Sequence, residues 1–221
     1  MPGVPEVCSI ISHELRTPLT VLQGYLRLIQ RGSGPPNPAH VSAMLDATAQ
    51  LAAVGRQASD LSGWLRDFAD TPPGDVLPVA SFLDALRRSA ASAHPVELVI
   101  DTPAATGDHH LALRGGPDPL ARAVVAVATA VARHAETTDA RLLVAPPPTR
   151  LALDIRAEAP AAPADLSVPR MPGDERPWYM SGGFGLALVS SVMVLEASGG
   201  QVQWLPDQRA AIVSLPLDGR S

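Results

Sequence analysis

Lysine is absent from this chain of 221 residues, so all 17 of its basic residues are arginine. We interpret this absence as a compositional habit of the source, with no bearing on mechanism. The single cysteine, Cys8, excludes a disulfide framework and a cysteine-based zinc cluster within the chain. No apolar run reaches the ~18 residues needed to span a bilayer. The start lacks the basic region and apolar core of a signal peptide, and we expect a cytoplasmic protein.

Charge and aromatic content narrow the possible partners. The net charge is −5, no basic block is present, and aromatic residues make up 4% of the chain. Nucleic acid is therefore not an expected partner. The length suffices for one large or two small domains.

The first 70 residues carry two helical patterns with apolar positions that alternate in spacing between three and four, as in a coiled-coil seam. The turn at 31–38 (RGSGPPNP) separates residues 4–31 from a helix that begins at Pro38, with Asn37 as its N-cap. A hairpin with an apolar seam is a poor monomer, so we expect a homodimer that forms a four-helix bundle. The first seam is Cys8, Ile11, Leu15, Pro18, Leu22, Tyr25 and Ile29. The second is Met44, Ala47, Leu51, Val54, Ala58, Leu61, Leu65 and Phe68.

The rest of the chain alternates helix and strand patterns after a linker at 71–78. This order predicts an α/β layered domain over 79–221, and hence an α+β protein. The predicted helices are 79–93, 117–135 and 186–198, and the predicted strands are 96–101, 141–145, 151–155, 201–205 and 210–215. Residues 157–180 form a Pro-rich loop, too long for a plain connection. It contains Trp178 and Tyr179, which either anchor a partner or pack the loop onto the sheet.

The most informative segment is 12–20 (SHELRTPLT) in the first helix. His13 falls opposite the seam and so faces solvent, Thr17 lies one turn later, and Glu14 is adjacent. Pro18 cannot donate to the carbonyl of Glu14, so we expect the helix to bend there. An exposed imidazole beside a carboxylate can be reached by a second protein. The alternative interpretation is a solvated surface histidine.

Segment 12–20 resembles the phospho-acceptor motif of bacterial sensor histidine kinases. The resemblance implies that His13 accepts a phosphoryl group, that Glu14 hydrogen-bonds the imidazole or acts as the base, and that Thr17 orients water for dephosphorylation of a response regulator. Because few residues precede His13, we expect no sensor domain in the chain.

The α/β pattern resembles the histidine kinase ATP-binding domain, of the Bergerat type shared with gyrase and MutL ATPases. Residues 181–189 (SGGFGLALV) look like its glycine-rich lid box, so Gly182, Gly183 and Gly185 are the candidate phosphate contacts. A glycine-rich turn that opens a helix is also a common structural device.

The remaining boxes of this domain are degenerate. At the two positions where the family has the magnesium-binding Asn stand Ala126 and Ala130, which cannot ligate a hard cation. Ala157 replaces the aspartate that bonds adenine, and Glu158, one residue displaced, could substitute only with a local shift. Arg133 and His134 match a basic and an aromatic or His position of the family. We therefore expect no cofactor, with ATP and Mg²⁺ only under an alternative reading, and no metal. His109 and His110 lack a third ligand at suitable spacing.

Our leading hypothesis is a dimeric two-component phosphotransfer protein, a pseudokinase in a phosphorelay. His13 would exchange phosphoryl groups with a response regulator receiver domain and, in one variant, with an upstream histidine kinase. Two alternatives stay open. One is an ATP-dependent histidine kinase with a divergent site, and the other is a non-enzymatic adaptor that binds kinases or regulators.

Overall fold

The computed structural model describes residues 4–32, 37–70, 76–92, 96–102, 109–112, 116–145, 150–158, 185–205 and 208–218. These form two compact units: Pro2–Gly63 is one, and the other includes Trp64–Ser221. The division falls inside a helix, whereas the sequence suggested a boundary after residue 70. Each unit is described by itself.

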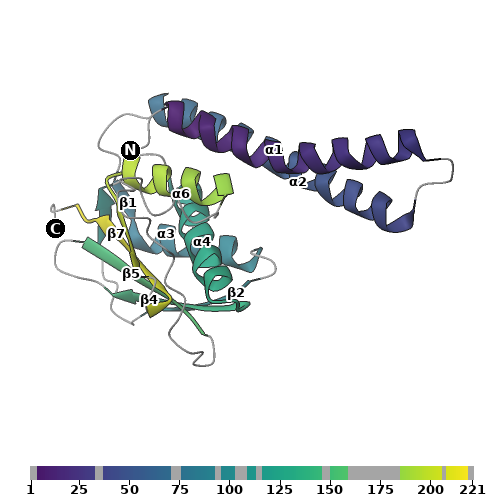
Figure 1. The fold of residues 1–221 in the computed structure, drawn as a ribbon. Coiled ribbons are helices and arrows are strands. Elements are labelled where there is room, and N and C mark those ends of the chain that lie inside the picture. The colour runs from purple at the N-terminus through teal and green to yellow at the C-terminus, as the bar shows by residue number, and fades with distance from the viewer. Residues whose placement is uncertain are drawn as a thin grey trace, which may run out of the picture. The chain divides into compact units, whose positions relative to one another are not determined.

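The first unit is a helical hairpin made by α1 (Val4–Arg31) and most of α2 (Pro38–Asp70) (Figure 1). The predicted helix bounds and the N-cap are confirmed, because the Asn37 Oδ1 accepts a hydrogen bond from the Ala39 amide at 2.9 Å. The inner face of the hairpin follows the predicted seams, with Pro18, Ala47, Val54 and Leu61 buried. Tyr25 of α1 packs on His40 of α2, with ring centroids 4.9 Å apart.

Two of the predicted seam positions are exposed in the single hairpin-bearing chain. Cys8 is exposed near the start of α1, and Leu65 is exposed in α2. Leu65 belongs to the second compact unit, so the heptad spacing continues beyond the part of α2 that the hairpin uses.

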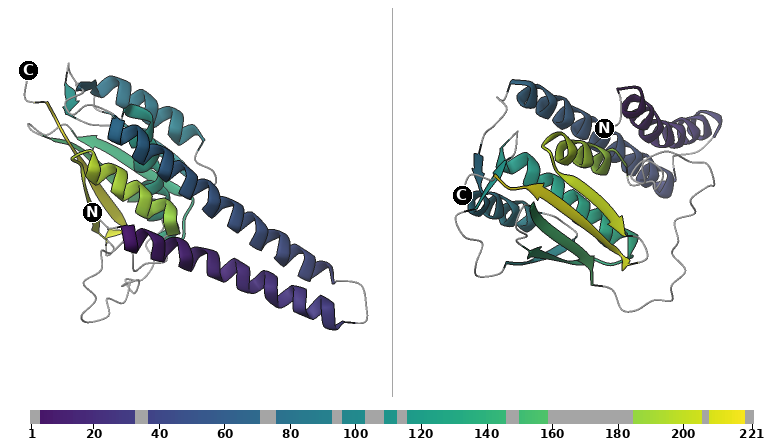
Figure 2. Two further views of the ribbon diagram at one scale, coloured as in Figure 1. Left: turned by 90° about the horizontal axis from the view of Figure 1, so that it is seen from above. Right: turned by 90° about the vertical axis from the view of Figure 1, so that its left-hand side faces the viewer.

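The second unit is built on a five-stranded sheet with the order β2-β4-β5-β7-β6. Only the β2–β4 pair is parallel. The strands are β2 (Glu97–Asp101), β4 (Asp139–Ala145), β5 (Arg150–Ala157), β6 (Gln201–Leu205) and β7 (Ala210–Pro216). The views in Figures 1 and 2 agree that α3 (Val79–Ala91), α4 (Pro117–His134) and α6 (Gly185–Ala197) lie along one face of this sheet.

Strand alternation places the core on the helical side of the sheet. In β4, Ala140, Leu142 and Val144 are buried, while the residues between them are exposed. The same alternation continues in β5 and β7. Ten residues of α4 are buried, so this helix forms the centre of the core.

The predicted linker at 71–78 needs correction. Residues Val76–Pro78 form strand β1, which pairs antiparallel with β3 (His110–Ala112). Three residues that end in proline carry no local strand pattern, and their partner lies far along the chain. Helix α6 ends just before Gly199, which has φ +82°, a conformation that suits a helix C-terminus.

Candidate functional site

His13 is exposed on α1, as its position opposite the seam predicts. Thr17 is also exposed one turn later, and Glu14 is half-buried. Pro18 is buried in the hairpin seam, and α1 runs through it without a break in the helix. Within the described part of the chain, no hydrogen bond or ion pair engages the side chains of His13, Glu14 and Thr17. The imidazole is therefore accessible to another macromolecule, with a carboxylate and a hydroxyl nearby.

Neighbouring hydroxyls of α1 are already used by the helix itself. The Ser12 Oγ donates to the Cys8 carbonyl and the Thr20 Oγ1 to the Arg16 carbonyl, both at 2.8 Å. Thr17 makes no such bond among the described residues. The Thr17 hydroxyl, one turn after the histidine, thus remains available to a partner or to water.

The positions expected to face a nucleotide are apolar. Ala126 is half-buried and Ala130 is 6% exposed, one turn apart on α4. Neither side chain has an oxygen that could bind Mg²⁺. Ala157 is the last residue of β5, and strand alternation turns its side chain to the helical side of the sheet, like Ile155. The site as described offers no side-chain ligand at these three positions.

Glu158 faces the other side of the sheet. Its amide donates to the Asp139 carbonyl at 2.9 Å, which continues the β4–β5 ladder by one residue. Its side chain therefore shares the solvent face with Arg141, and the Arg141 Nε lies 2.9 Å from the Glu158 Oε1. Arg141 also lies 3.4 Å from the Asp101 Oδ2. This arrangement argues against Glu158 as a substitute for the missing aspartate, which the sequence allowed only with a local shift.

Of the expected lid residues, only Gly185 lies in the described part of the chain, where it begins α6. Gly182 and Gly183 lie outside the described residues, as do Trp178 and Tyr179. His109 is exposed and His110 is half-buried in β3. Among the described residues, no three His, Cys, Asp or Glu side chains are grouped closely enough to hold a metal ion. No described helix has the length and apolar character that crossing a membrane requires.

Comparison with known proteins relates the hairpin and the whole chain to proteins of known family. Residues 6–62 match the His Kinase A (phospho-acceptor) domain family. Probable sensor histidine kinase TcrY of Mycobacterium tuberculosis is 30% identical over 233 residues, which cover 94% of this chain. By sequence, the hairpin of this chain carries a His Kinase A (phospho-acceptor) domain, and the whole chain is similar to the catalytic core of a sensor histidine kinase. It spans only 45% of the length of TcrY.

A solved structure supports the same fold. Acinetobacter baumannii histidine kinase AdeS superposes with a TM-score of 0.57 at 16% identity, over 95% of this chain and 98% of that one. The helical hairpin followed by a layered sheet domain is thus a fold that the chain shares with AdeS. The predicted α+β class is confirmed.

The end of α4 has a packing role that the sequence did not reveal. The His134 imidazole packs edge-on against Trp204 of β6, with ring centroids 5.5 Å apart, while Arg133 is exposed. Burial, and then the positive charge of Arg209, lower the pKa of His134 below its usual value. His134 therefore joins α4 to the β6–β7 hairpin in its neutral form.

We expect His134 to make stability depend on pH. The unfolded chain binds a proton at the usual imidazole pKa of about 6.5, while the folded chain resists it. The free energy of unfolding should therefore be highest above this pH and fall as the pH drops through it towards the lower folded pKa. Urea unfolding of His134→Gln from pH 8 to 5 should show a flatter profile than wild type. Identical profiles would contradict this assignment.

Arg141 is a residue that sequence reasoning missed. Its two acidic partners come from β2 and from the end of β5, so the contact depends on strand order and register. No local motif indicates such a contact. Only a prediction of the register between β4 and β5 would have indicated the contact of Arg141 with Glu158.

Proposed function

We propose that this histidine kinase core is a two-component signal transduction protein that carries a phosphoryl group on His13 without ordinary use of ATP. The observation that supports the proposal most is the contrast between its two halves. The phospho-acceptor position is exposed and has Glu14 and Thr17 beside it, whereas the positions for metal and adenine are alanines.

The proposed reaction on His13 transfers a phosphoryl group between an imidazole nitrogen and a carboxylate oxygen. A neutral imidazole nitrogen attacks the phosphorus of an aspartyl phosphate on a receiver domain. An N–P bond forms, the P–O bond breaks, and its electron pair returns to the regulator's carboxylate. The reverse transfer passes the group on to another regulator. Glu14 would accept a hydrogen bond from the other ring nitrogen or take its proton, and Thr17 would orient water for hydrolysis of the regulator's aspartyl phosphate.

The proposed loss of ATP use rests on missing metal ligands and on the placement of Glu158. Phosphoryl transfer from ATP depends on positioning and on metal ions that neutralise the phosphates. Ala126 and Ala130 supply no metal ligand, and Glu158 is paired with Arg141 on the opposite face from Ala157. The competing function is ATP-dependent autophosphorylation, which the similarity to a probable sensor histidine kinase favours.

One experiment separates these functions. The full chain is incubated either with labelled Mg-ATP or with a receiver domain that carries a labelled aspartyl phosphate. We expect acid-labile label on His13 only from the receiver domain, and no micromolar Mg²⁺-dependent ATP binding by calorimetry. Labelling by ATP at a comparable rate would replace our proposal with the kinase function. Labelling by neither donor would leave the adaptor function.

We also propose that the hairpin forms a homodimer, because it leaves large apolar side chains exposed. Leu26 of α1 is 48% exposed and Leu45 of α2 is 65% exposed. Leu19, Leu28 and Val41 are exposed as well. A second hairpin would remove this surface from water, which stabilises association by roughly 25 cal/mol per Å².

Charged residues at these positions should prevent dimerisation. We expect the double variant Leu26→Glu, Leu45→Glu to be monomeric in light scattering at micromolar concentration, with its helical content retained. Leu143→Glu is the matched control, since Leu143 is exposed on the sheet of the other unit and should leave the dimer intact. A monomeric wild type would refute the dimer.

A further inference from the structure

Strand β2 forms one edge of the five-stranded sheet, because β4 is its only neighbour among the described strands. The pairing with β4 uses alternate residues of β2. The Glu97 amide donates to the Thr138 carbonyl at 2.7 Å, so in this parallel ladder the odd-numbered residues of β2 bond to β4. The backbone groups of Leu98 and Ile100 therefore point away from the sheet. Each offers one N–H and one C=O to an additional strand.

Two apolar side chains lie exposed beside this edge. Val99 of β2 is 41% exposed and Leu143 of β4 is 38% exposed. The register pairs Val99 with Arg141, and Leu143 comes two residues later, so the two apolar side chains are diagonal neighbours on the open face of the sheet. Among the described residues from 76 onwards, Val76 is the only other large apolar residue with such exposure. A side chain on an added strand would cover Val99 from the outer side of β2.

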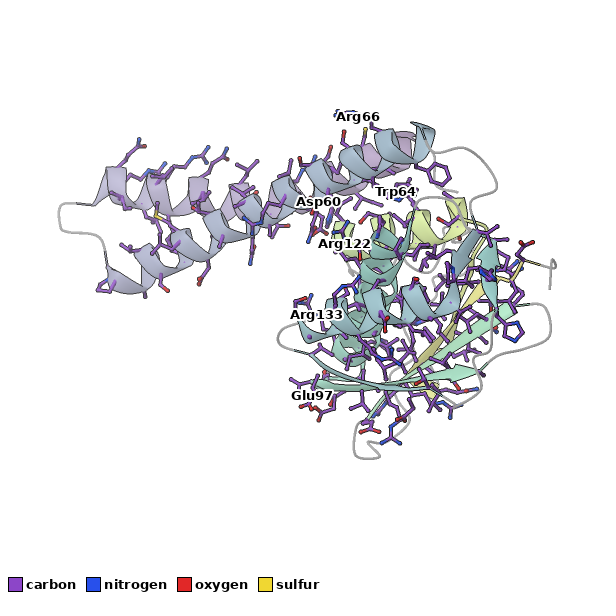
Figure 3. All side chains as sticks on the ribbon, turned by 180° about the vertical axis from the view of Figure 1, so that it is seen from behind. Asp60, Trp64, Arg66, Glu97, Arg122 and Arg133 are labelled. Atoms are coloured by element: carbon purple, nitrogen blue, oxygen red, sulfur yellow. The ribbon has the colours of Figure 1, made fainter. Side chains whose placement is uncertain are left out.

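The charge around this edge is negative. Glu97 and Asp101 occupy the two ends of β2, and both are exposed on the open face. Figure 3 shows Glu97 on the sheet, at the margin of this unit. Asp139, which the register places opposite Glu97, is exposed as well, and Glu158 follows on the next strand. Arg141 is the basic residue among these four carboxylates, so the edge favours a positively charged partner.

The same charges decide against a second copy of this chain as the added strand. Antiparallel pairing of two β2 strands centred on Val99 would place Glu97 of each copy opposite Asp101 of the other. Like charges directly opposite each other on paired strands are destabilising. An extended segment with basic residues opposite both acids and an apolar residue opposite Val99 has the complementary pattern instead.

We propose that the β2 edge binds an extended segment of another protein in which two basic residues flank an apolar one at alternate positions. The main chain of this segment bonds to Leu98 and Ile100, and its apolar residue covers Val99. Its basic residues lie opposite Glu97 and Asp101. Docking of this kind is independent of which donor supplies the phosphoryl group.

Peptide titration of the full chain, followed by amide NMR, tests this docking. The probe is the end-capped peptide Arg-Thr-Val-Thr-Arg, whose pattern reads the same in both directions and so suits parallel or antiparallel addition. We expect millimolar peptide to shift the amides of Leu98 and Ile100 and to slow their hydrogen exchange, with no change in β6, the opposite edge strand. Absence of shifts in β2, or equal shifts in β6, would overturn the proposal.

Two control peptides separate backbone pairing from charge. The same peptide with N-methylated amides keeps both charges but has no N–H to donate to the β2 carbonyls. The peptide Glu-Thr-Val-Thr-Glu keeps the donors and reverses the charge. We expect neither control to shift the β2 amides. Equal binding of the methylated peptide would show electrostatic attraction alone, and equal binding of the acidic peptide would exclude charge pairing, so either result would overturn the proposal.

Variants of the edge test the same contacts from the other side. Ile100→Pro removes an outward N–H and leaves the bonds to β4 in place, so it should weaken binding of the basic peptide roughly ten-fold. Ile100→Val keeps the N–H and should bind like wild type. The amide spectrum shows whether each variant keeps its fold.

A charge variant does not depend on the proline variant folding. Glu97→Gln should weaken binding of the basic peptide about two- to five-fold. Gln203→Arg on β6 is the matched control, because it makes the same change in net charge on the other exposed edge and should bind like wild type. Equal effects of Glu97→Gln and Gln203→Arg would overturn the docking at β2.

Discussion

His13→Gln should reduce phosphoryl exchange with a receiver domain to background while the dimer and its helical content remain as in wild type. Glutamine has no nucleophilic imidazole nitrogen, so the N–P bond cannot form. The side chain is exposed and makes no contact that holds the hairpin, so its loss should change the free energy of unfolding by no more than about 0.5 kcal/mol. The measurement is acid-labile label on the purified chain after incubation with phosphorylated regulators.

Two further variants make this result specific to the site. Gln23→Ala, exposed elsewhere on α1, should exchange label like wild type. Thr17→Ala should leave phosphorylation of His13 intact and slow dephosphorylation of the partner regulator. If His13→Gln exchanges label as well as wild type does, the adaptor function should replace the phosphotransfer function.

Leu61→Asp should unfold the hairpin, which is the largest stability effect we expect in this part of the chain. Leu61 is 6% exposed, so aspartate would place an unpaired charge in the seam and would lose the leucine packing. Together these cost about 3 kcal/mol or more. Circular dichroism during thermal unfolding would show the loss of helix.

Leu65→Asp is the matched control one turn later on the same predicted seam. Leu65 is 45% exposed, so a carboxylate there stays hydrated and should change stability by less than about 1 kcal/mol. Equal destabilisation by the two substitutions would mean that the seam extends through Leu65 after all.

The elements that could be predicted from the sequence are those set by local patterns. Both hairpin helices follow from apolar spacing and from the Asn37 cap, whose hydrogen bond joins residues two apart. The exposure of His13 follows from the same helical periodicity. Strand β1 could not be predicted, because its three residues are ordered by pairing with β3.

For the candidate nucleotide site, the sequence could predict only which residue types are present. The sequence alone states that the side chains of Ala130 and Ala157 lack polar atoms. The direction of the Glu158 side chain depends on the β4–β5 register and on Arg141, which no single-sequence pattern reveals. The lid glycines Gly182 and Gly183 stay predictions.

Under the proposed loss of ATP use, the alternation at the end of β5 also limits how this chain could regain an adenine contact over evolutionary time. Side chains at neighbouring strand positions point to opposite faces of the sheet, so an acidic residue at position 158 cannot replace one at position 157. Small backbone adjustments would not carry Glu158 across the sheet, and mutations that loosen Arg141 would only release it into solvent. Recovery would require an acidic residue at position 157, either by substitution of Ala157 or by its deletion, which brings Glu158 into that position. A one-residue shift of the whole strand would instead turn Leu151, Leu153 and Ile155 outward, so only changes at the very end of β5 leave the core intact.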